Sequence, residues 1–308
     1  ELVRGVQPRA ARMANAVLRR IAGLRDEADG AHEAVVAASR GEREDVSARE
    51  LSVASGYPEW LAARFLAELG LRRAAAMCAC ALDPAPVSAD RVSSRLGEIG
   101  ANPEPTGLPD SWRLSSGASL AGSGLVSSCD VAVADLSAQL VCRVAAPCTG
   151  RVLEVGQGRG TKSLLLARAM EELGAEPCVC GCELVASKVR QSAARMERAG
   201  LSCSVSCVEF DGTRLAEQDE LPEALSGSFE SVLVDAPCSG MGTMRRHPEI
   251  AWALDESALS GGPETLASLQ LSLLRAASAR VAPGGFLVYA TCSVLSCENE
   301  DVVDAFLA

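Results

Sequence analysis

The chain of 308 residues is long enough for about two domains, and its 48% hydrophobic residues can form a substantial core. Aromatic residues make up only 3% of the chain, so aliphatic side chains must fill most of that core. The formal net charge of −11 argues against a broadly basic nucleic-acid-binding protein, because phosphate contacts supply most of the affinity of such proteins. A local basic patch on an acidic body stays compatible with this composition.

The chain contains 13 cysteines and 2 histidines. The paired CxxC spacing of zinc sites is absent from the sequence, so we predict no metal centre. Cys178, Cys180 and Cys182 alternate as the residues of a strand do, and the simplest interpretation is small apolar side chains in a reduced interior. The sequence shows neither an apolar run of membrane-spanning length nor a signal peptide. We therefore predict a cytoplasmic protein with no membrane partner.

The first half of the chain changes composition twice. Residues 1–30 carry apolar side chains at helical spacing with arginines between them, which predicts an amphipathic helix with a basic face. Residues 31–48 are polar and charged and are predicted to form a linker. Residues 49–143 alternate short apolar runs with Pro and Gly, a pattern that predicts a small α+β module.

From about residue 150 strand patterns alternate with helix patterns, which predicts an α/β fold with a parallel sheet and right-handed crossovers. The expected strands lie near residues 151–155, 177–183, 204–209, 230–235 and 285–291. The expected helices lie near residues 161–173, 186–199 and 264–281. Ligands of such sheets bind outside the carboxyl ends of the strands, so residues at those ends are the first candidates for function.

The first expected strand runs into the glycine-rich turn GQGRGTKS. Gly156, Gly158 and Gly160 allow the backbone to turn tightly and to approach a ligand closely, with a helix N-terminus behind them. Glu183 ends the second strand, where a carboxylate can accept hydrogen bonds from ribose hydroxyls. Asp211 is predicted to end the third strand, in position to hold an adenine amino group. These strand ends together predict a nucleotide-like ligand.

The same turn nearly matches a phosphate-binding P-loop, G-x-x-x-x-G-K-[ST]. In addition, the sequence VLVDAP resembles a magnesium-holding strand. Thr161, however, stands where the P-loop requires glycine, and a nucleoside triphosphatase has no use for cysteines at two strand ends. The P-loop is therefore the less favoured interpretation.

Two further strands end in sequences that carry cysteine. DAPCSGMGTMRRHPE begins at Asp235 and contains Cys238, and ATCSVLSCENE contains Cys292. An acid and two thiols at neighbouring strand ends suit nucleophilic catalysis, although the residues alone do not decide which cysteine attacks. The ENE sequence at 298–300 is typical of a helix cap.

These two motifs resemble the Sun/Fmu (RsmB-like) family of RNA (cytosine-5) methyltransferases, and the resemblance covers most of the chain from about residue 45. It implies a Rossmann-like, S-adenosylmethionine-dependent methyltransferase domain at residues 144–308, with the C-terminal hairpin of the family apparently missing. It also implies an RRM-like accessory domain at 49–143, which we assign to positioning because the aromatic residues of RNA-reading RRM domains are absent. Residues 1–30 resemble the last helix of a NusB-like domain.

The resemblance also implies roles for individual residues. Cys292 would attack C6 of cytosine, and Cys238 would assist product release. Asp235 would contact both the cytosine edge and the cofactor, and Lys162 would reach the target base beside it. The glycine turn departs from the AAPGGKT sequence of the family, because Arg159 stands in place of Pro and Thr161 in place of the second Gly.

The predicted function is methylation of cytosine C5 in RNA, with ribosomal RNA as the expected substrate and transfer RNA as the alternative. The altered glycine turn favours a third hypothesis, a non-catalytic RNA-binding or assembly factor on the same fold. Arg245 and Arg246 are expected to bind a phosphate or a flanking nucleotide of the substrate. We expect a monomer.

Overall fold

The computed structural model describes residues 25–90, 93–115, 117–217, 219, 221–254, 256–259 and 265–308. They fall into two compact units. The first contains the chain up to Pro84 together with Met241–Ser257, and the second contains Ala85–Gly240 and Ala258–Ala308. Residues 1–24 of the predicted N-terminal helix lie outside the described residues.

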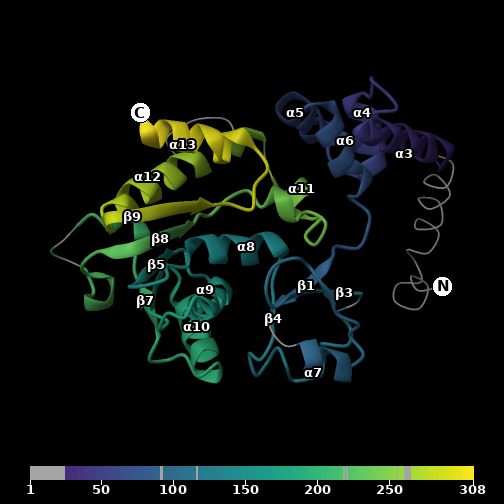
Figure 1. Cartoon of the computed structure of the whole chain (residues 1–308). Coiled ribbons are helices and arrows are strands. Elements are labelled where there is room, and N and C mark those ends of the chain that lie inside the picture. The colour runs from purple at the N-terminus through teal and green to yellow at the C-terminus, as the bar shows by residue number, and fades with distance from the viewer. Residues whose placement is uncertain are drawn as a thin grey trace, which may run out of the picture. The chain divides into compact units, whose positions relative to one another are not determined.

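The first unit is helical (Figure 1). Its helices are α3 (Arg25–Arg40), α4 (Ala48–Ser55), α5 (Glu59–Leu69), α6 (Leu71–Ala79), the 3-10 turn η5 (Met241–Thr243) and α11 (Ile250–Ala253). Val35, Leu51 and Phe65 are fully buried in its core. The late segment is tied to this core, because the Trp252 indole N–H donates to the Gly56 carbonyl at 3.1 Å.

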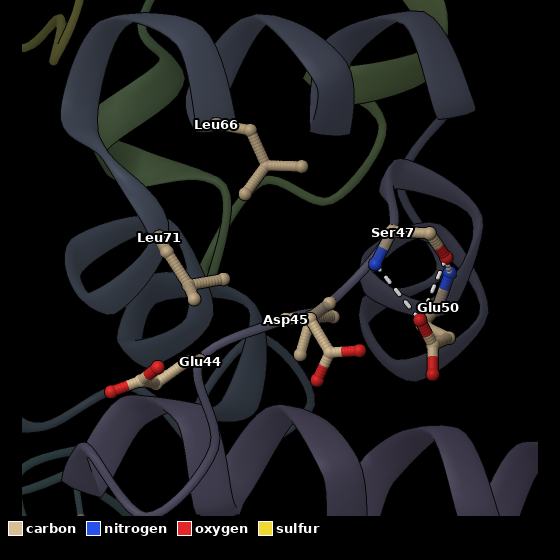
Figure 2. Close-up of a pocket in the computed structure, with 7 residues that line it drawn as sticks. Glu44, Asp45, Ser47, Glu50, Leu66 and Leu71 are labelled. Atoms are coloured by element: carbon tan, nitrogen blue, oxygen red, sulfur yellow. Dashed lines mark hydrogen bonds between the residues drawn. The ribbon is translucent and has the colours of Figure 1, made fainter.

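Helix α4 begins at a capping box. The Ser47 hydroxyl accepts the Glu50 backbone N–H at 3.2 Å, and the Glu50 carboxylate accepts the Ser47 backbone N–H at 2.8 Å. Figure 2 shows this pair at the edge of a pocket that Leu66 and Leu71 also line. Glu44 and Asp45 add two more carboxyl groups to the lining, so the pocket is acidic and ill suited to a phosphate-bearing ligand.

The predicted linker at 31–48 is wrong for its first ten residues, because α3 continues to Arg40. Ala31, Ala34, Val35 and Ala38 are buried at helical spacing, and this apolar stripe stabilises a helix despite the charged residues between them. The predicted start of the accessory domain at residue 49 is also wrong, since α4 to α6 belong to the helical unit.

The second unit begins with a small antiparallel sheet in the order β2-β3-β1-β4. Its elements are β1 (Val87–Asp90), α7 (Ser93–Glu98), β2 (Glu104–Pro105), β3 (Ser111–Leu114) and β4 (Ala132–Val133). A central β1 flanked by β3 and β4 is compatible with a split βαβ fold, but the described residues between β3 and β4 form turns rather than a second helix. An α+β module is thus present, and its RRM-like character stays a prediction.

The larger sheet has five parallel strands in the order β7-β6-β5-β8-β9. These are β5 (Val152–Val155), β6 (Val179–Glu183), β7 (Val205–Glu209), β8 (Phe229–Asp235) and β9 (Val281–Ala290). The main helices are α8 (Leu136–Ala145), α9 (Thr161–Glu172), α10 (Ala186–Arg198), α12 (Leu266–Ser278) and α13 (Glu300–Leu307). Short 3-10 turns are η2 (Gly212–Arg214), η4 (Glu223–Leu225), η6 (Glu256–Leu259) and η7 (Ser296–Glu298).

The sheet lies between two helical layers, with α8, α9 and α10 on one side and α12 and α13 on the other (Figure 1). Leu166 and Met170 of α9 pack on the first face, and Leu274 of α12 packs on the second. Strands covered on both faces need near-continuous apolar sequence, which β5 and β8 have. The predicted parallel α/β sheet is confirmed.

A buried ion pair joins the small sheet to α9, which covers one face of the larger sheet. The Arg168 guanidinium on α9 donates to the Asp90 carboxylate of β1 at 2.9 Å and also to the Cys129 carbonyl. Both side chains are at least 90% buried, with 6% and 2% of their surfaces exposed.

None of the described helices has the length and the apolar surface needed to cross a bilayer.

Candidate active site

The candidate site lies at the carboxyl ends of β5 and β8. These two strands are neighbours in the sheet, and the strand order runs outward from them in opposite directions. This is the switch point at which open α/β sheets bind ligands. Gly156 follows β5 with φ 85°, and a Cβ placed there would lie 2.4 Å from the backbone oxygen of Asp235 at the end of β8. Glycine is therefore required, and the turn rests directly against the strand end that carries Asp235.

Glu183 at the end of β6 holds the glycine turn. Its carboxylate accepts the backbone N–H groups of Gly158 and Val185, each at 2.9 Å. Gly160 packs on α10, because a Cβ there would lie 2.4 Å from the Ser192 hydroxyl. The three glycines and Glu183 that the sequence singled out are thus assembled in one place.

Asp211 differs slightly from its expected position. Strand β7 ends at Glu209, so Asp211 lies just beyond the strand and caps the short turn η2. Its carboxylate accepts the Thr213 backbone N–H at 3.0 Å and the Thr213 hydroxyl at 2.7 Å. Its expected contact with adenine stays a prediction.

Cys238 and Cys292 meet at the ends of β8 and β9. Their sulfur atoms lie 3.1 Å apart, and the Cys292 backbone N–H donates to the Cys238 sulfur at 3.2 Å. The hydrogen bond that the Cys292 thiol donates lowers the pKa of Cys238 from its ordinary 9.0 to about 7, although burial opposes this. The same shared proton raises the pKa of Cys292 far above its ordinary range. Within the pair Cys238 is therefore the more acidic thiol, and Cys292 is the one that keeps its proton.

Lys162, near the start of α9, forms an ion pair with Asp235 in which Nζ and Oδ2 are 2.6 Å apart. Burial disfavours the charged lysine, but the attraction and hydrogen bond of Asp235 outweigh it and raise the pKa of Lys162. Both charges also act on Cys292, so the acid, the lysine and the thiol pair form one cluster. The structure thus brings together all four residues that the sequence predicted to be catalytic.

Arg245 and Arg246 belong to the helical unit. Arg245 donates to the Pro84 carbonyl at 2.7 Å, which gives it a structural contact in that unit, and Arg246 is exposed. Their expected contact with the substrate stays a prediction.

A family model described as 16S rRNA methyltransferase RsmB/F matches residues 144–308, more than half of the chain. The chain belongs to this family. The predicted Sun/Fmu relationship is thereby confirmed, together with the assignment to an S-adenosylmethionine-dependent methyltransferase family.

Named relatives agree with the RsmB/F assignment. "Probable ribosomal RNA small subunit methyltransferase B" of Bacillus subtilis (strain 168) is 30% identical over 272 residues, covering 84% of this chain and 57% of that protein. "Ribosomal RNA small subunit methyltransferase B" of Xylella fastidiosa (strain Temecula1 / ATCC 700964) is 33% identical over 267 residues, covering 82% and 58%. The chain thus spans 57–58% of the length of these two relatives.

The fold itself recurs in a solved structure of a methyltransferase homolog protein from Pyrococcus horikoshii. The TM-score is 0.68 at 20% sequence identity, and the match covers 84% of this chain and 81% of that chain. At this level of identity the likeness extends to the fold alone.

Sequence reasoning assigned Glu298 to a helix cap and missed its role in organising the RsmB/F site. Its buried carboxylate accepts the Ser239 backbone N–H at 2.8 Å and the Gln270 amide at 3.2 Å, so it fixes the turn directly after Cys238. The prediction that ENE caps the last helix is wrong for Asn299, whose side chain makes no capping bond. It instead accepts the Thr291 hydroxyl at 2.6 Å and donates to the Leu295 carbonyl at 2.8 Å, bracing the Cys292 loop. The polar residues 298–300, which follow the last apolar strand, were the sequence signal that could have indicated these roles.

Two buried acceptors beside the glycine turn were also missed. Glu154 of β5 is fully buried, which raises its pKa to about 8, and Ser163 donates to one of its oxygens. The other oxygen, and Oε1 of Gln157, find no donor among the described residues. A ligand with amino and hydroxyl donors, such as S-adenosylmethionine, fits such a lining. Within the same described ranges, no three His, Cys, Asp or Glu side chains are arranged to hold a metal ion.

Proposed function

We propose that this chain carries out S-adenosylmethionine-dependent methylation of cytosine C5 in RNA, with ribosomal RNA as the substrate. The observation that supports this most directly is the close pair of Cys238 and Cys292, whose sulfur atoms lie 3.1 Å apart, beside the Lys162–Asp235 ion pair. Two cysteines that share one proton can pass it between them, which suits a reaction that makes and then breaks a carbon–sulfur bond.

The chemistry requires an activated ring carbon, because C5 of cytosine is a weak nucleophile. When bound, S-adenosylmethionine supplies an electrophilic methyl group at its sulfonium. The target base must leave its stack to reach the strand ends. Asp235 then accepts a hydrogen bond from the exocyclic amino group of the base, and the Lys162 ammonium donates to the same edge.

The cysteine pair provides the nucleophile. The Cys238 thiolate takes the proton of Cys292, and the resulting Cys292 thiolate adds to C6 and raises the electron density at C5. After C5 is methylated, its proton leaves to a water molecule and the bond between Cys292 and C6 breaks. Cys238 returns its proton to the Cys292 sulfur as that bond breaks, which assists release of the product and restores the resting pair. In this proposal Cys292 attacks and Cys238 assists release, the roles that the family resemblance implies.

The test measures methyl transfer from labelled S-adenosylmethionine to unmodified ribosomal RNA and to transfer RNA. We expect Cys292→Ala to abolish transfer, and Cys238→Ala to accumulate a covalent protein–RNA adduct. Cys148→Ala is the matched control, since Cys148 is an exposed thiol outside the site, and it should retain full activity. Transfer to transfer RNA alone would reassign the substrate. Cofactor binding without methyl transfer or adduct on either RNA would favour the non-catalytic factor.

A further inference from the structure

Three arginines gather on the outer side of the glycine turn. Arg195 of α10 donates to the hydroxyl of Thr161, the first residue of α9. Arg198 follows one turn later on the same helix, and Arg159 precedes Thr161 by two residues in the turn. The three guanidinium groups therefore come from two elements that a hydrogen bond holds together.

The charge of this cluster is not balanced within the unit. None of the three arginines forms an ion pair with a carboxylate in the part of the chain that the structure describes. Arg195 is half-buried, and burial, together with repulsion from Arg198 and Arg159, lowers its pKa although Cys129 opposes this. Mutual repulsion of this kind is relieved when an anion binds among the cations.

We propose that Arg159, Arg195 and Arg198 form a binding site for phosphate groups of the RNA backbone. This rests on the proposed RNA methyltransferase function and adds to it the place where the substrate's backbone is held. Arginine suits that role because its planar fork of donors matches phosphate oxygens in pairs. The site also reconciles the net charge of −11 with RNA binding, since it concentrates positive charge without carboxylate partners next to the glycine turn of an acidic chain.

A second anion to consider is the carboxylate of S-adenosylmethionine itself. That cofactor also carries a sulfonium and an ammonium group, so its net charge is positive and three arginines together would repel it. Arg159 and Arg198 are exposed, which suits contact with an extended polyanion rather than with one enclosed carboxylate. RNA phosphate is therefore the better chemical match.

The decisive measurement is the salt dependence of RNA binding. Binding of a short single-stranded RNA is monitored by fluorescence anisotropy at a series of salt concentrations. For each phosphate that the protein no longer binds, the slope of log K against log salt concentration should fall by about 0.7. We expect this reduction for Arg159→Gln and for Arg198→Gln, and about 1.4 for the double variant. Arg195→Gln is avoided because it also breaks the bond to Thr161.

Arg275→Gln is the matched control. Arg275 is an exposed arginine on α12, on the opposite face of the sheet, and its guanidinium donates to the Ala305 carbonyl at 3.4 Å. The Arg275→Gln substitution removes one positive charge from the same unit. Any effect of net charge alone on RNA binding should therefore be equal in this control variant. Cofactor affinity is measured in parallel by calorimetry, and we expect it to stay within twofold in all variants.

A slope that falls no more in the Arg159 and Arg198 variants than in Arg275→Gln would overturn the proposal, as would wild-type protein that fails to bind RNA. Weaker cofactor binding with an unchanged slope would also overturn it and assign the arginines to the cofactor carboxylate. Failure of the proposed function looks different, because wild-type protein would bind RNA with the full slope yet transfer no methyl group to it.

Discussion

The ionisation of the two cysteines gives the sharpest test of the site. Cys238 shares a proton with Cys292, and this lowers the pKa of Cys238 to about 7. Removing the Cys292 thiol by Cys292→Ala takes away the largest cause of that shift. The pKa of Cys238 should then rise toward its ordinary value of 9.0. Because the thiolate is the reactive form, the pH at which Cys238 becomes half-reactive should rise with it.

The size of the effect follows from these two values. At pH 7 a thiol with pKa about 7 is half ionised and one with pKa about 9 is about 1% ionised, a difference of about 50-fold in thiolate. The backbone N–H groups of Cys292 and Gly240 still donate to the Cys238 sulfur in the variant and keep part of the shift. We therefore expect the midpoint to rise by at least one pH unit.

The assay is alkylation by iodoacetamide across a pH series, with peptides quantified by mass spectrometry after tryptic digestion. Trypsin releases residues 215–245 as one peptide in which Cys238 is the only cysteine. Cys148, an exposed cysteine in its own tryptic peptide, serves as the internal reference. The midpoint matters more than the rate at one pH, because a thiolate of lower pKa is also a weaker nucleophile.

For wild-type protein, labelling of Cys238 should increase as the pH rises through about 7 and level off above it. An unchanged midpoint in Cys292→Ala would refute the shared proton. A wild-type midpoint near that of an ordinary thiol would do the same, and the proposed passage of a proton between the two sulfurs would then have no basis.

Four further substitutions test the framework of the site. Gly156→Ala should abolish methyl transfer and destabilise the fold, because its Cβ meets the Asp235 carbonyl. Gly174→Ala has a similar φ of 76° and open space around it, and should cost only about 1–2 kcal/mol in urea unfolding. Asp90→Ala strands the buried charge of Arg168 and should lower the free energy of unfolding by about 3–5 kcal/mol, so a decrease below 1 kcal/mol would contradict the buried pair. Glu298→Ala releases the turn after Cys238 and should reduce methyl transfer at unchanged cofactor affinity, as calorimetry would show.

Much of the catalytic unit could be predicted from sequence because its signals are local. A short β-branched run followed by a turn identifies a parallel strand, and the residue after the run is then placed at the ligand edge of the sheet. That pattern was sufficient to locate Asp235, Cys238 and Cys292. The sharing of a proton between the two sulfurs could not be predicted, because it depends on a distance of 3.1 Å between residues 54 positions apart.

The helical unit was predicted less well from the sequence. Residues 31–40 carry an apolar stripe at helical spacing that the linker prediction overlooked, because the charged run that begins after Arg40 dominates this part of the sequence. The burial of this stripe against α4 and α6 explains why α3 forms there. Local sequence also gives no sign that Met241–Ser257, which follows the catalytic motif directly, packs with helices from the start of the chain. Contacts of this kind join segments that are far apart in the sequence, so neither segment alone indicates its partner.

This division gives Glu298 a particular importance. The chain leaves the catalytic unit at Gly240, two residues after Cys238, and returns to it only at Ala258. Any movement of the helical unit would therefore pull on the backbone next to the Cys238 thiolate. The Glu298 carboxylate accepts hydrogen bonds from the backbone N–H and the hydroxyl of Ser239. On the other side of Cys238, the Gln270 amide donates to the Pro237 carbonyl at 2.9 Å. Hydrogen bonds within the catalytic unit itself therefore hold the backbone on both sides of Cys238.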